Sequence, residues 1–184
     1  MTVAWFTIFF IVLIWSGINP KDYFTWMLEV MPALIALGLL IFTRKRFKFT
    51  GLAYALILVH CIILMIGGHY TYAEVPLFHW LKDVFDLERN NYDKVGHFAQ
   101  GFIPAMVARE ILIRNSVVKN KNWLVLFVIS ICLSISALYE LIEWWVAELA
   151  GESSEAFLVL RDTRGIHNRT WAGHCWAPFY HWYY

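Results

Sequence analysis

The chain alternates between long apolar runs and short polar segments, a pattern typical of a protein that crosses a membrane several times. Several runs approach the roughly 20 apolar residues that an α-helix needs to span a bilayer. The expected spans are about Val3–Ile18, Phe24–Phe42, Gly51–Ile66, Val95–Ile113 and Trp123–Val146. The pattern therefore predicts an all-α fold, a polytopic transmembrane helical bundle with five spans.

Two shorter features lie between the third and fourth spans. Gly67-Gly68 is expected to end the third span, because glycine pairs commonly mark turns. Leu77–Phe85 combines aromatic and charged residues, which predicts a short amphipathic helix lying at the membrane surface.

Composition and charge support a membrane location and set an orientation. The sequence is 60% hydrophobic, so we expect the lipid bilayer as a partner. Its formal net charge is +1, and it has no basic stretch interleaved with aromatic residues, so nucleic acid is not an expected partner. The two basic segments, Arg44–Lys48 and Arg109–Lys121, lie two spans apart. The positive-inside rule then places both segments and the N-terminus in the cytoplasm. No positive residue precedes the first run, so we expect a retained helix and not a signal peptide.

The first candidate site is the segment YDKVGHFAQGF at the start of the fourth span. Asp93 and His97 are four residues apart, so on a helix they share one face, about 6 Å apart along the axis. Lys94 and Gln100 lie beside them. Polar groups at the end of a membrane helix are costly unless they are paired or hydrated, which favours a functional site. The alternative is an ordinary helix start, in which Asp93 complements the helix dipole and Lys94 extends to water.

The second candidate site is the segment YELIEWW near the end of the fifth span. It carries Glu140 and Glu143, three residues apart. The predicted topology puts both glutamates at the same outer face as Asp93 and His97. These four residues are the catalytic candidates, and Asp93, His97 and Glu140 are candidate ligands for a divalent metal ion. Alternatively, Glu143 lies at the interface within a belt of tryptophans.

The last 26 residues differ from the rest of the chain. Residues 159–184 hold a polar stretch and then a cluster of aromatic residues with Cys175, which is neither a span nor a typical soluble tail. Codons for aromatic residues and cysteine begin with T, and codons with T in the middle specify apolar residues. We suppose that one G has been lost between Leu158 and Val159. If that G is restored and the wobble bases are chosen freely, the segment can encode GTQGYAWDTQSDMGWALLGAILSLVL in the shifted frame. We therefore predict a transmembrane bundle at 1–158 and a frameshifted tail at 159–184.

The genomic DNA tests this prediction. We expect the shifted frame to encode that peptide as a polar entry followed by an apolar helix. A shifted frame that stops or encodes another peptide would contradict it.

The two motifs resemble those of the YjdF-type bacterial inner membrane proteins, over about Met1–Leu158. They are more distantly similar to VanZ-like proteins, which are associated with glycopeptide resistance. The resemblance implies a bacterial inner membrane location and a sixth span that begins with a motif like WDTQSDM, which the shifted frame restores. It also implies that the motif residues are Asp93, Lys94, His97, Gln100, Glu140 and Glu143.

Three functions stay open at this point. The first is a membrane-embedded enzyme at the outer face, acting on a lipid-linked or envelope substrate with His97 as base or metal ligand. The second is a proton-coupled transporter or permease in which Glu29, His60 and Glu140 line a path. The third is a structural membrane protein without catalysis.

Overall fold

The computed structural model describes residues 2–150 of the 184-residue chain. Within this range, the side chains of Glu143 and of residues 147–150 are not described. The predicted tail at 159–184, with Cys175, lies outside the described residues. The division of the chain at residue 158 therefore stays a prediction.

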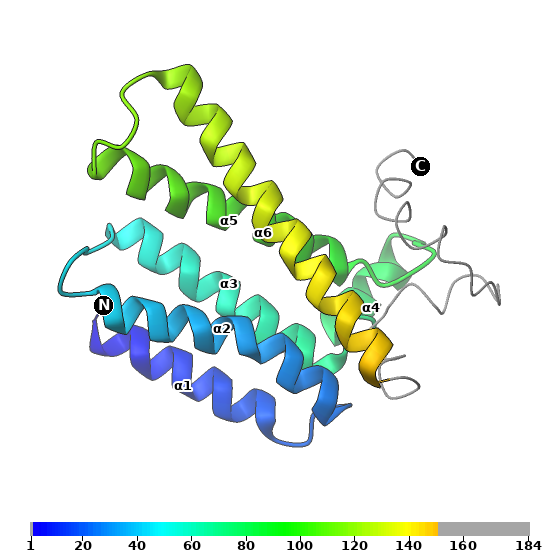
Figure 1. Cartoon of the computed structure of the whole chain (residues 1–184). Helices are drawn as coiled ribbons and strands as arrows, with labels where there is room; N and C mark the ends of the chain where they lie inside the picture. The colour runs from blue at the N-terminus through cyan, green and yellow to red at the C-terminus, as the bar shows by residue number, and fades with distance from the viewer. Residues whose placement is uncertain (1, 151–184) are drawn as a thin grey trace.

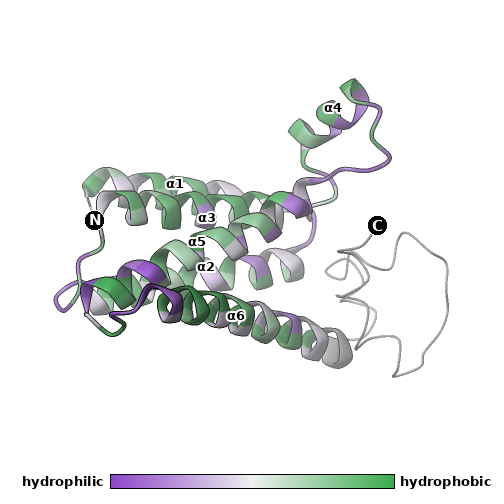
Figure 2. Ribbon diagram, turned by 90° about the horizontal axis from the view of Figure 1, so that it is seen from above, coloured by the Kyte–Doolittle hydropathy of each residue, from purple (hydrophilic) through white to green (hydrophobic). Residues whose placement is uncertain are grey.

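The described part of the chain is a helical bundle, which confirms the all-α prediction. Its helices in chain order are α1 (Val3–Gly17), α2 (Tyr23–Thr43), α3 (Gly51–Tyr70), α4 (Pro76–Val84), α5 (Tyr92–Arg114) and α6 (Lys121–Ala150). The five long helices lie side by side, and the short α4 stands apart at one end (Figures 1 and 2). The α2–α3 and α5–α6 loops, which carry the basic clusters, share the other end, here called the basic end (Figure 1). The end with α4 is called the α4 end.

The described helices differ in how well they suit a bilayer. Those long and apolar enough to cross a membrane are α2, α3 and the Lys121–Val146 part of α6. Helix α1 is apolar but has only 15 residues, and α5 has 23 residues with several charged side chains. Both pack against the spanning helix α3. A membrane-protein bundle follows, whereas the count of five spans stays a prediction.

The prediction that Gly67-Gly68 ends the third helix is wrong. Helix α3 continues through both glycines to Tyr70, and both are buried. The physical reason is close packing, because side chains from two other segments approach α3 at these positions. The predicted short helix exists as α4, at Pro76–Val84, with its apolar Leu77 and Trp80 exposed, whereas its location at the membrane surface stays a prediction.

Helix α3 lies at the centre of the bundle and contacts α1, α2 and α5, while α6 packs on α5. The apolar core lies among α1, α2 and α3, and its buried members include Phe9, Val30 and Met65. Two indole groups are satisfied within this region: Trp5 Nε1 donates to the Tyr54 carbonyl at 2.8 Å, and Trp26 Nε1 donates to Ser16 Oγ at 3.1 Å. Such pairing matters in lipid, where water cannot satisfy a polar group.

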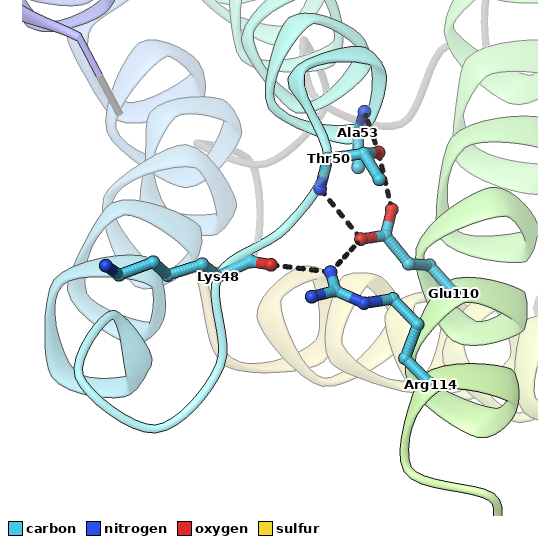
Figure 3. Close-up of polar contacts among 5 residues, drawn as sticks. All are labelled: Lys48, Thr50, Ala53, Glu110 and Arg114. Carbon is cyan, nitrogen blue, oxygen red and sulfur yellow. Dashed lines mark hydrogen bonds and ion pairs between the residues drawn. The ribbon is translucent and has the colours of Figure 1, made fainter.

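At the basic end, a polar cluster fastens α5 to the start of α3 (Figure 3). The Glu110 carboxylate accepts hydrogen bonds from the Thr50 amide and hydroxyl, both at 2.7 Å, and from Arg114 at 2.6 Å. Thr50 is also the N-cap of α3. Arg114 donates in turn to the Lys48 carbonyl and lies over the Phe47 ring, 4.6 Å from its centroid. One carboxylate thus holds the loop, the cap and the end of α5 together.

We expect Glu110→Ala to destabilise the protein by about 0.5–1.5 kcal/mol, because it removes the hydrogen bonds that join α5 to Thr50, while water can replace the acceptor for these exposed donors. Thermal unfolding in detergent, followed by circular dichroism, measures this. The matched control is Glu88→Ala, which removes an exposed acid. Equal stability of the two variants would contradict the role of Glu110.

Candidate functional site

The most enclosed acidic group in the described part of the bundle is Glu29, on α2. Its exposed fraction is 6%, although it lies in a helix suited to a membrane. The Tyr72 hydroxyl donates to Glu29 Oε2 at 2.9 Å, and Tyr139 on α6 is a second hydrogen-bond partner. A carboxyl group from one helix is therefore satisfied by phenols from two other segments of the chain.

Tyr72 reaches Glu29 because the chain reverses sharply after α3. Thr71 and Tyr72 both have left-handed backbone angles, with φ of 57° and 54°, and the Tyr72 amide donates to the Gly67 carbonyl at 2.9 Å. Left-handed geometry is unfavourable for residues other than glycine, so tertiary contacts must maintain it. The hydrogen bond to Glu29 and the packing of the Tyr72 ring are such contacts.

The Tyr72 ring fits between α3 and α5 only because glycines face it from both helices. A Cβ atom added at Gly96 would lie 2.9 Å from the ring, and one at Gly67 would lie closer still. On the α2 side, a Cβ at Gly68 would lie 3.0 Å from the Glu29 Cβ. These three glycines allow Tyr72 and Glu29 to meet.

Tyr92, the first residue of α5, completes the enclosure. Its ring lies 5.6 Å from the Tyr72 ring, and its hydroxyl donates to the Ile63 carbonyl at 3.0 Å. Burial, with the nearby Glu29 charge, raises the pKa of the Tyr72 phenol well above its usual value. Tyr72 therefore stays protonated and remains a hydrogen-bond donor at any physiological pH.

The first predicted motif lies beside this cluster and partly within it. Tyr92 and Gly96 are on the buried face of α5, whereas Asp93 and His97 follow them by one residue and lie about 100° further round the helix. Asp93 accepts an ion-paired hydrogen bond from Arg89 at 2.8 Å, and His97 is exposed. Of the other two motif residues, Lys94 is exposed and Gln100 is half-buried.

The second predicted motif lies at the same height along the bundle as the first. Tyr139 contacts Glu29 from α6, and Tyr72, which donates to Glu29, packs against Gly96 of α5. Glu140 follows Tyr139 and His97 follows Gly96, so these two residues lie at a similar height. Glu140 is exposed on α6, and the side chain of Glu143 lies outside the described residues.

A metal centre is not assembled by the described side chains. Among the described side chains, no three His, Cys, Asp or Glu side chains gather closely enough to hold a metal ion. Metal binding by Asp93, His97 and Glu140 therefore stays a prediction.

Sequence reasoning undervalued Glu29 and missed Tyr72. Glu29 was considered only as one residue lining a transport path, and the structure shows its carboxyl group buried among side chains of the bundle. His60, its suggested companion, lies about two turns before Gly67 on α3. The signal available in the sequence was the set of Gly67, Gly68 and Gly96, which indicates close approach of other groups.

The fold and site together define a polytopic helical membrane protein with a buried carboxyl group joined to tyrosines. The chain belongs to the family described as "Predicted membrane protein (DUF2238)", whose model matches residues 1–165. It is similar to inner membrane protein YjdF of Escherichia coli (strain K12), with 47% identity over 148 residues, covering 80% of this chain and 71% of that protein. No solved structure matches the chain. The protein is therefore a multi-pass protein of the bacterial inner membrane, as the YjdF-type resemblance implied; the VanZ-like resemblance stays a prediction.

We expect Gly67→Ala and Gly96→Ala each to destabilise the protein by about 1–3 kcal/mol, because the added methyl group collides with the enclosed Tyr72 ring. Thermal unfolding in detergent measures this. Gly101→Ala is the matched control on α5, since its Cβ would meet nothing within 4 Å; it should be neutral or stabilising by up to about 1 kcal/mol. The packing account fails if Gly96→Ala is as stable as Gly101→Ala.

Proposed function

We propose that the protein binds and acts on a polar lipid-linked or envelope substrate at the α4 end of the bundle. The observation that carries this proposal is the exposure of His97 and Glu140 on neighbouring helices of a membrane bundle. Ionisable side chains in such positions are costly when only lipid surrounds them, so a polar partner at this face would stabilise them.

In this proposal, His97 is the general base or a metal ligand, because an imidazole nitrogen can accept a proton or coordinate a metal ion. Glu140 orients the substrate or shares the metal, with Glu143 as a further acidic group. Asp93 is held by Arg89 and has a positioning role at the start of α5. The Glu29–Tyr72 contact supports the site indirectly, because Tyr72 packs against α5 and Glu29 contacts Tyr139 of α6, the two helices that carry His97 and Glu140.

We expect purified protein to retain a polar lipid-linked species that His97→Ala and Glu140→Gln lose several-fold, because both variants remove exposed polar contacts. Mass spectrometry of the extracted lipids, together with metal analysis of the same samples, measures this. His79→Ala is the matched control, since it removes an exposed imidazole from α4. Identical lipid and metal content in all three variants and the unsubstituted protein would contradict the proposal.

The transporter alternative is favoured by a separate observation, the burial of Glu29 among tyrosines inside the bundle. Proteoliposomes with a trapped pH dye distinguish the two functions. A proton-coupled transporter predicts proton flux that Glu29→Gln abolishes and the exposed-acid control Glu88→Gln preserves. Flux that survives in Glu29→Gln rejects that alternative, and the absence of both flux and bound substrate favours a structural protein.

A further inference from the structure

The basic end carries cations that the described part of the protein does not neutralise. Arg44, Lys45 and Lys48 are exposed at the end of α2 and in the loop that follows. Among the described side chains, the ion pairs are those of Lys21, Arg89 and Arg114, so none involves these three cations. The nearby acid Glu110 already accepts hydrogen bonds from Thr50 and Arg114.

The same cations line two adjoining hollows. The larger, about 880 Å³, is lined by Arg44, Lys45 and Lys48 together with Ile41 and Phe42. The smaller, about 300 Å³, shares Arg44 and Lys48 and is also lined by two aromatic residues, Phe49 and Tyr54. Positive charge therefore surrounds concave surface next to a membrane helix.

The walls of the larger hollow join the charged region to an apolar one. Phe42 is 79% exposed and Ile41 is 47% exposed, and both belong to the last turn of a helix suited to crossing a bilayer. A ligand that fits must have an anionic head beside an apolar chain. We propose that these hollows are a binding site for the phosphate headgroup of an anionic phospholipid, whose acyl chains lie along Ile41 and Phe42.

The loop that carries the site is fixed from α5. Arg114 donates to the Lys48 carbonyl at 2.5 Å and covers the Phe47 ring. The backbone of the α2–α3 loop is therefore held on the side that faces α5. The Lys48 side chain points away from Arg114 and Glu110 (Figure 3). The cations are thus presented outward from a backbone that is already ordered, which lowers the entropic cost of binding.

The test uses the full chain in nanodiscs of equal parts phosphatidylglycerol and phosphatidylethanolamine, with retained lipids counted by native mass spectrometry. We expect preferential retention of phosphatidylglycerol, which Arg44→Gln/Lys48→Gln reduces by at least about tenfold, since each juxtamembrane cation contributes roughly fivefold in affinity. Both side chains are exposed, so the variant should keep its unfolding temperature.

The matched control is Lys119→Gln/Lys121→Gln, which removes two exposed charges from the other basic loop at the same end. Retention in this control supports a defined site. Equal loss in both double variants would show only diffuse attraction and would overturn the proposal, as would unchanged retention in Arg44→Gln/Lys48→Gln. Displacement of the retained lipid by inorganic phosphate would also overturn it, because the site would then bind a soluble anion.

Discussion

The hydrogen bond between the Tyr72 hydroxyl and the Glu29 carboxyl group organises the α4 end of this bundle. A charged or polar group inside a membrane helix costs several kilocalories per mole unless other protein groups satisfy it. A hydrogen bond to such a group contributes about 1.5–3 kcal/mol. The cost of placing Glu29 on α2 is therefore offset only if a donor reaches it. The reversal after α3 brings Tyr72 to that position.

Several features that look unrelated in the sequence follow from this contact. Glycines at 67, 68 and 96 remove the side chains that would keep Tyr72 from Glu29. Tyr92 encloses the same ring from the start of α5, and Tyr139 reaches the same carboxyl group from α6. At the opposite end, Glu110 is also shared between helices, but there its partners are exposed donors of Thr50 and Arg114. One acid thus joins helices at each end, Glu29 in an enclosed position and Glu110 among exposed partners.

Sequence patterns predicted the fold well and the site only in part. Apolar runs located each long helix to within a few residues, because burial in lipid demands such runs. At the end of α3, Gly67-Gly68 resembled a stop signal but serves close packing. Motif reasoning selected Asp93, His97 and Glu140, and the structure puts their sequence neighbours Tyr92, Gly96 and Tyr139 around the Glu29–Tyr72 pair. That partnership depends on contacts between residues 43 positions apart or more, which helical periodicity cannot show.

A double-mutant cycle between Glu29→Leu and Tyr72→Phe, measured by thermal and chemical unfolding in detergent, tests the central claim most directly. If the carboxyl–phenol contact organises this end, each single change leaves a polar group without its partner. The pair of changes should then cost less than the sum of the two, with a coupling of about 1–3 kcal/mol. Effects that add to within about 0.5 kcal/mol would contradict the account, because the two side chains would then act independently.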